Sequence, residues 1–194
     1  MSECRLVEGR SAGSLMPPTA EIADAGLERS TVVRSVVVGY GTKRGSTREV
    51  AEAVAAVLRE RDFAVELLPA REIKDVRRYD GLVLGGALYR GRWHRDARRL
   101  LKRHRGALAA MPVAVFGMGP RRHGEEALLR SRNQLERALA KVPEVKPVAA
   151  GTFGGVDRER GLDVRDWDAI RAWAAEVANA FDAASAQEPS TDRS

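Results

Sequence analysis

The residues best suited to chemistry lie in one short segment, Gly41 to Thr47, with the sequence GTKRGST. It follows a β-branched run, 35–40, and precedes apolar residues at helical spacing. Glycine lets a backbone approach a ligand closely, hydroxyls donate hydrogen bonds, and a helix N-terminus offers free N–H groups with about half a positive charge. Such a turn can bind phosphate. Its spacing matches neither the P-loop nor G-x-G-x-x-G, and a capped turn that binds no ligand is an equally good interpretation of this segment alone.

Two later glycine-rich segments, Gly85 to Trp93 and Gly117 to His123, each follow an apolar run. Both combine glycine with flat or polarizable side chains, which suits the faces and edge of a planar ring. Tyr89 and Trp93 could instead cover the adjacent helix, and Met118 is a candidate for core packing. The catalytic residue is unknown, and His123 is the one weak candidate because it could deliver a proton to a ring bound beside it.

Regular elements must position these segments. Short apolar runs predict strands at 35–40, 64–68, 80–85, 112–117 and 147–153, and helical periodicity predicts helices from Ser46, over 94–108, over 125–141 and over 166–181. Ser46 to Glu49 has the pattern of a capping box, so we expect these two side chains to cap the first helix reciprocally. The segment 69–80 is the weakest crossover, with room for only a helical turn or two.

The alternation of strands and helices predicts an α/β fold, a doubly wound five-stranded parallel sheet with helices on both faces. In the order 2-1-3-4-5, ligands bind beyond the carboxyl ends of the strands. The first, third and fourth strands then end together, and the three segments described above converge there.

The ends of the chain differ from its centre. We expect a flexible N-terminal leader at 1–33, one domain at 34–182 and a disordered tail at 183–194. The two ends are distinguished by their mixed Gly, Ser, Pro and charged composition.

Composition also limits the class of protein. With 44% hydrophobic residues among 194, the chain can bury a core. A single cysteine, Cys4, excludes a disulfide framework and a multi-cysteine metal site, and we expect no metal. The chain shows no secretion signal and no apolar run of membrane-spanning length, so we expect a cytoplasmic protein.

Three stretches, Val38 to Thr47, Leu84 to Tyr89 and Val115 to Gly117, resemble the flavodoxin family. They are most similar to the branch that contains menaquinone-dependent protoporphyrinogen IX dehydrogenase, over about 34–181. The resemblance implies a flavodoxin-like fold, bound FMN and flavin-dependent oxidoreductase activity linked to heme biosynthesis. It assigns the FMN phosphate to Thr42, Lys43, Arg44, Gly45, Ser46 and Thr47. It assigns the flavin ring to Ala87, Leu88, Tyr89, Arg90, Gly91, Gly117, Met118, Gly119 and Pro120.

One departure leaves the activity open. The dehydrogenase branch carries a longer segment before its last helix, whereas here residues 154–165 form a short, highly charged link. This puts the porphyrinogen and quinone chemistry in question and leaves FMN binding untouched. The alternatives are a small electron-transfer flavodoxin serving a protein partner, and a flavodoxin-like domain without FMN that acts as a binding module.

The net charge of +6 favours anionic partners. Basic residues crowd the segment Arg92 to Arg105, where Asp96 is the one acidic residue. This segment could be a solvated helix face, or it could dock onto an anionic membrane at its inner face or onto an acidic protein. Nucleic acid is the least favoured partner for this segment, because no aromatic side chains are interleaved among the basic residues to stack on bases. A quinone or a redox protein is a further possible partner, and the sequence does not indicate an oligomeric state.

Overall fold

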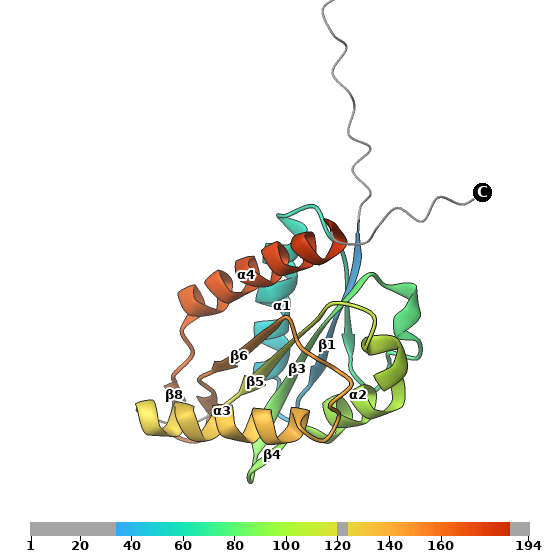
Figure 1. Ribbon diagram of the computed structural model, residues 1–194. Coiled ribbons are helices and arrows are strands. Elements are labelled where there is room, and N and C mark those ends of the chain that lie inside the picture. The colour runs from blue at the N-terminus through green and yellow to red at the C-terminus, as the bar shows by residue number, and fades with distance from the viewer. Residues whose placement is uncertain (1–33, 120–123, 187–194) are drawn as a thin grey trace, which may run out of the picture. The chain divides into compact units, whose positions relative to one another are not determined.

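The computed structural model describes residues 34–119 and 124–186. Five parallel strands form its sheet (Figure 1): β1 Ser35–Gly41, β2 Ala64–Pro69, β3 Gly81–Tyr89, β5 Val113–Met118 and β6 Ala149–Phe153. Their spatial order is β2-β1-β3-β5-β6. Counted along the chain, these parallel strands have the order 2-1-3-4-5, so the predicted doubly wound sheet is confirmed.

Four helices cover the sheet: α1 Ser46–Arg59, α2 Arg95–Leu108, α3 Glu125–Leu139 and α4 Trp167–Ala186. A short 3₁₀ helix, η1 Val76–Arg78, is the only helical turn in the crossover after β2. Helices α1 and α4 pack on one face of the sheet, and α2 and α3 on the other (Figure 1). Val36 and Val38 contribute to the first core and Val37 to the second. A strand buried on both faces is apolar at consecutive positions, which explains the continuous valine run.

The third strand is longer than predicted. β3 continues to Tyr89 because a two-residue strand, β4 Arg92–Trp93, folds back and pairs with it in antiparallel orientation. The turn between them has positive φ angles of 48° at Arg90 and 76° at Gly91. Residues 87–89, which we expected in a loop, are therefore the end of a strand.

The predicted capping box is wrong. The N-cap of α1 is Gly45, with φ of 90° and no side-chain cap. The Glu49 carboxylate instead accepts hydrogen bonds from Arg158 at 3.0 Å and from Arg165 at 2.5 Å. These arginines lie next to the strands of a second small sheet, in which β7 Val156–Asp157 pairs with β8 Leu162–Asp163: Arg158 follows β7 and Arg165 follows β8. The segment predicted as a plain link is thus a hairpin held against α1.

Several predictions concern residues outside the described ranges: the leader at 1–33, Pro120 and His123, and the tail beyond residue 186. Within the described ranges, α4 continues to Ala186. Residues 183–186, assigned to the disordered tail, are therefore helical. No helix in the described ranges has the length and apolar character needed to span a bilayer.

Candidate functional site

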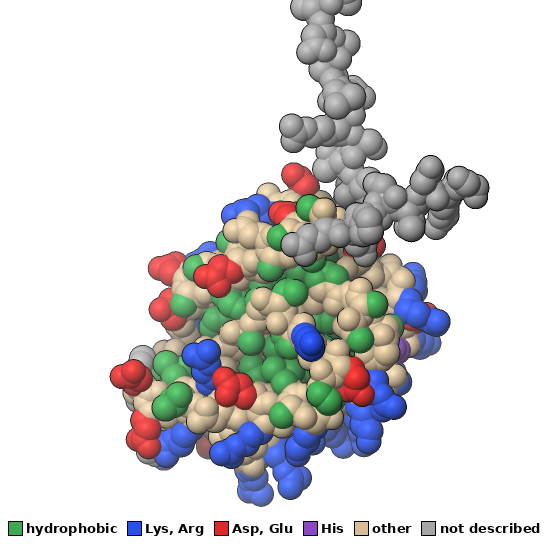
Figure 2. All heavy atoms as spheres, in the orientation of Figure 1, with side chains coloured by type: hydrophobic (Ala, Val, Ile, Leu, Met, Phe, Trp, Pro, Cys, Tyr) green, Lys and Arg blue, Asp and Glu red, His purple; other side chains and the backbone are tan. Residues whose placement is uncertain are grey.

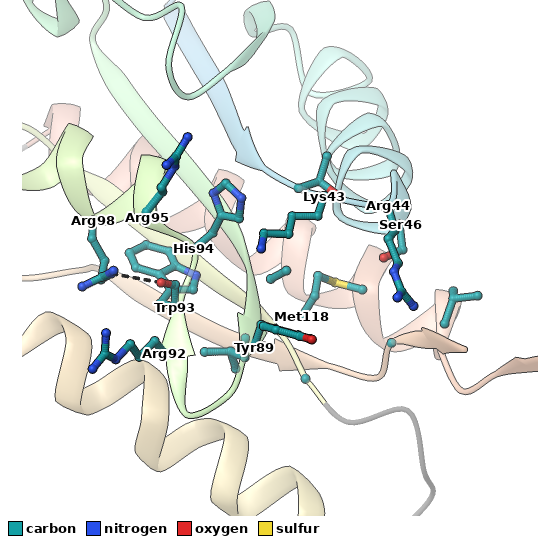
Figure 3. A pocket seen from close by; sticks show the side chains of 16 residues that line it. Lys43, Arg44, Ser46, Tyr89, Arg92, Trp93, His94, Arg95, Arg98 and Met118 are labelled. Atoms are coloured by element: carbon teal, nitrogen blue, oxygen red, sulfur yellow. Dashed lines mark hydrogen bonds between the residues drawn. The ribbon is translucent and has the colours of Figure 1, made fainter. Parts of the chain in front are cut away.

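A cavity of about 410 Å³ lies beyond the carboxyl ends of β1, β3 and β5, which the strand order predicts as the ligand site (Figure 3). Three parts of the chain build most of its wall: the β1–α1 turn, the β3–β4 hairpin with the start of α2, and the end of β5. The lining residues are Thr42, Lys43, Arg44, Ser46, Ala87, Leu88, Tyr89, Arg92, Trp93, His94, Arg95, Arg98, Met118, Gly119, Gly155 and Val156.

The β1–α1 turn is shaped by hydrogen bonds to its own backbone. The Gly45 amide donates to the Thr42 hydroxyl at 3.0 Å, and the Gly45 carbonyl accepts from the amides of Arg48 and Glu49. The left-handed backbone at Gly45 is strained for any residue with a Cβ. Within the described ranges, the amides of Ser46 and Thr47 have no hydrogen-bond acceptor. These two N–H groups at the start of α1 are free to bind an anion.

Thr47 supplies an independent sign of a ligand. Its side chain is 0% exposed, and its hydroxyl has no hydrogen-bond partner in the described part of the chain. Leaving a buried polar group unsatisfied costs about 1–3 kcal/mol, so such a group in a folded protein calls for an explanation. A phosphate ester held by the neighbouring amides would provide the missing acceptor. The turn therefore fits the phosphate of FMN.

The charges around the cavity are positive. Lys43 and Arg44 belong to the turn, and Arg92, Arg95 and Arg98 extend the basic lining to the hairpin and α2. Arg44 is partly neutralised by an ion pair with Glu159 at 3.3 Å. The Lys43 ammonium lies 5.4 Å from the centre of the Tyr89 ring, so it reaches across the cavity toward the hairpin (Figure 3). This field favours an anionic ligand.

The hairpin presents an aromatic surface to the cavity. Tyr89 is 49% exposed and offers its ring, whereas Met118 is nearly buried. Trp93 is 1% exposed, and its indole N–H donates to the carbonyls of Gly86 at 3.1 Å and Phe116 at 3.2 Å. Trp93 therefore holds the hairpin against the sheet, and Tyr89 is the ring available for stacking.

His94 completes the wall at the start of α2. Its Nδ1 atom accepts a hydrogen bond from the Asp96 amide at 3.3 Å and caps the helix, so the neutral ring carries its proton on Nε2. Burial lowers the pKa of His94, the positive charges of Lys43, Arg95 and Arg98 lower it further, and Asp96 opposes them. His94 is thus a neutral donor at neutral pH. A Cβ at Gly41 would lie only 2.5 Å from Nδ1, so glycine is needed there as long as His94 occupies this place.

The structure brings nine of the predicted site residues to this cavity: Thr42, Lys43, Arg44, Ser46, Ala87, Leu88, Tyr89, Met118 and Gly119. Gly45, Thr47 and Gly117 do not line it, and Arg90 and Gly91 line a separate hollow with Asp157 and Arg160. Pro120 and His123 lie outside the described residues.

The sequence did not assign seven lining residues to the phosphate or to the ring: Arg92, Trp93, His94, Arg95, Arg98, Gly155 and Val156. Two of them, Arg92 and Trp93, lie in the segment Gly85 to Trp93 that was predicted to reach the ligand. A signal for most of them was present. Tyr89 and Trp93 flank a short glycine-containing segment, which is typical of a β-hairpin. That turn would have placed Trp93 and the start of the next helix beside the cavity.

Comparisons with known proteins show the family and the fold. A family model described as "Flavodoxin domain" matches residues 37–178. The protoporphyrinogen IX dehydrogenase [quinone] of Escherichia coli strain K12 is 22% identical over 170 residues, which cover 74% of this chain and 94% of that protein.

Solved structures show the same fold. A point mutant of flavodoxin from Pseudomonas aeruginosa is 19% identical, with a TM-score of 0.56 and coverage of 76% of this chain and 99% of that one. Rubredoxin oxygen:oxidoreductase from Desulfovibrio gigas has a TM-score of 0.56 at 18% identity, and the match covers 78% of this chain but 37% of that larger one.

Proposed function

Because the chain belongs to the flavodoxin domain family, we propose that it binds FMN without a covalent bond and acts as a flavin oxidoreductase. The observation that carries the proposal is the buried, unpartnered hydroxyl of Thr47 beside the free amides of Ser46 and Thr47. A phosphate is the part of FMN that satisfies this set of donors.

The β1–α1 turn would bind the phosphate through these amides and through the hydroxyls of Ser46 and Thr47. Lys43 and Arg44 would add charge-assisted contacts, which are about twice as strong as neutral hydrogen bonds. His94 would donate from Nε2 into the same cavity. Lys43, Arg44, Ser46 and His94 already line the cavity, so their contacts would require little ordering of the protein.

The hairpin and the end of β5 would hold the flavin ring. Tyr89 would stack on one face, while Leu88 and Met118 would provide apolar contacts. Bound FMN supplies the electron-transfer chemistry, and the protein tunes it. Positive charge from Lys43 and Arg92 would stabilise added electrons, since an opposite charge about 4 Å away at a surface interacts by about 4 kcal/mol before screening.

The finer assignment is a dehydrogenase that resembles protoporphyrinogen IX dehydrogenase and passes electrons to a quinone. Similarity over most of both chains supports it. An electron-transfer flavodoxin is the second candidate, because the 154–165 segment is tied to α1 by Arg158 and Arg165 rather than left free to reach a membrane-bound partner. A turnover assay with protoporphyrinogen and menaquinone, compared with reduction of a carrier protein, distinguishes the two.

The first experiment is a titration with FMN and with riboflavin, which lacks the phosphate, followed by flavin fluorescence. We expect saturable FMN binding and much weaker riboflavin binding. Absence of saturation with FMN would contradict the proposal and favour the binding module. Equal affinity for both flavins would contradict the assignment of the phosphate to the β1–α1 turn.

A further inference from the structure

A row of positive side chains begins at the cavity and follows α2 to its far end. We call it the basic stripe: Arg92, Arg95, Arg98, Arg99, Lys102 and Arg105. From Asp96 onward, the buried residues of α2 face the sheet and are all apolar, so the cations lie on the opposite side of the helix. Figure 2 shows Lys and Arg side chains gathered along the lower right edge, where α2 lies in Figure 1. At 1.5 Å per residue, the helical part of the stripe from Arg95 to Arg105 is roughly 15 Å long.

The stripe is less neutralised than the other helices in the described part of the chain, although Arg95 pairs with Asp96 and Arg105 with Glu144. Arg99 and Lys102 are exposed and have no ion pair in the described part of the chain. Asp96 is the one acidic residue of α2. On α3, by contrast, three glutamates balance three arginines, and Arg130 and Arg132 each pair with a glutamate one turn away, so that Arg137 alone of the α3 arginines has no ion pair within the described residues. An arginine-rich composition alone would affect both helices alike, so the uncompensated charge is a feature of α2.

The stripe lacks the apolar centre that a protein interface requires. Its apolar residues Leu100, Leu101 and Leu108 are all buried in the core. None of the large exposed hydrophobic side chains of the described residues belongs to α2. Protein interfaces draw most of their affinity from apolar and aromatic groups at their centre. An anionic lipid surface needs only an array of cations, because its negative charge is diffuse.

We propose that the basic stripe docks the protein on the surface of an anionic phospholipid membrane. Binding is electrostatic and peripheral, since α2 has no exposed apolar face to insert. Arg92, Arg95 and Arg98 belong both to the stripe and to the cavity wall, so docking turns the cavity toward the bilayer. The docking does not depend on FMN. If the proposed function also holds, it brings the flavin within reach of a lipid-soluble electron acceptor.

The test is sedimentation of the full-length protein with vesicles of phosphatidylcholine alone or mixed with phosphatidylglycerol. We expect binding only to the anionic vesicles, weakened by salt. Each Lys or Arg near such a surface strengthens binding roughly fivefold, so the double variant R99E/K102E should lose at least about 25-fold. The matched control is R137E/K141E on and just after α3, which makes the same change in net charge at two exposed residues without ion pairs in the described ranges.

Strong binding by the control and loss by R99E/K102E would support the stripe. Three results would overturn it: no binding of the wild type to anionic vesicles at low salt, equal losses in both variants, or stronger binding to duplex DNA or to an acidic protein than to vesicles. Circular dichroism of both variants verifies the fold. FMN titration of the same samples reports separately on the proposed function, so a failure of one proposal is distinguishable from a failure of the other.

Discussion

The two sides of the cavity are built on different principles. The β1–α1 turn offers backbone amides and small hydroxyls, fixed by the left-handed Gly45 and by hydrogen bonds within the turn. The β3–β4 hairpin offers the exposed ring of Tyr89, held in place by a buried indole. One side can recognise a phosphate and the other a flat ring. Changes in the two sides should therefore separate fold stability, phosphate recognition and ring binding.

The largest effect is expected from Trp93→Ala. Removing this buried side chain leaves a cavity and removes two hydrogen bonds to strand carbonyls, which should lower the free energy of unfolding by about 4 kcal/mol. Urea unfolding followed by circular dichroism measures it. Trp93→Phe keeps most of the volume and should cost only about 1–2 kcal/mol for the lost hydrogen bonds. If Trp93→Ala and Trp93→Phe lowered the free energy of unfolding by similar, small amounts, this would show that Trp93 does not hold the hairpin.

Thr47→Val tests the opposite side. The change keeps the shape and removes the unpartnered hydroxyl, so the unliganded protein should be as stable as the wild type or slightly more stable. FMN affinity should fall about tenfold, or about 1.4 kcal/mol, for one lost phosphate contact. Riboflavin affinity should not change. Parallel losses for both flavins, measured by fluorescence titration, would place Thr47 outside the phosphate site.

Tyr89→Ala should show the complementary pattern. The loss of one stacked ring costs about 1 kcal/mol, so affinity for FMN and for riboflavin should fall about fivefold together. Tyr89→Phe retains the ring and serves as the control, with affinity near that of the wild type. A variant that lost FMN alone would show that Tyr89 and Lys43 act on the phosphate rather than on the ring.

The smallest effect concerns pH. The pKa of His94 is lowered in the folded protein, so its contribution to stability is complete above about pH 6.5, the usual pKa of histidine, and is lost as the pH falls toward the lowered value. His94→Asn, which can still cap α2, should weaken the pH dependence of the melting temperature measured by thermal unfolding. Burial also lowers the pKa of His104, so His104→Asn is needed to isolate that contribution. If the melting temperature of His94→Asn depended on pH as strongly as that of the wild type, the assignment of this pH dependence to His94 would be wrong.

Local patterns predicted the strands, the helices and the β1–α1 turn, because buried strands and helical faces leave periodic signals in the sequence. The strand order was that of the predicted fold class, since no local pattern specifies which strands are neighbours. The capping box failed for a non-local reason. Glu49 is engaged by Arg158 and Arg165, which are more than a hundred residues away along the chain. Likewise, β4 has only two residues, too few for any periodic pattern. The cavity wall that begins at Trp93 therefore depends on a chain reversal that periodicity could not reveal.

The tight approach of Gly41 to His94 has an evolutionary consequence. Nδ1, Cγ and Cβ of His94 all lie within 3.0 Å of the place where a methyl group at position 41 would sit. A mutation that enlarges position 41 would displace the imidazole and uncap α2. Natural variants of this protein should therefore change positions 41 and 94 as a pair, a bulkier residue at the first accompanying a smaller one at the second.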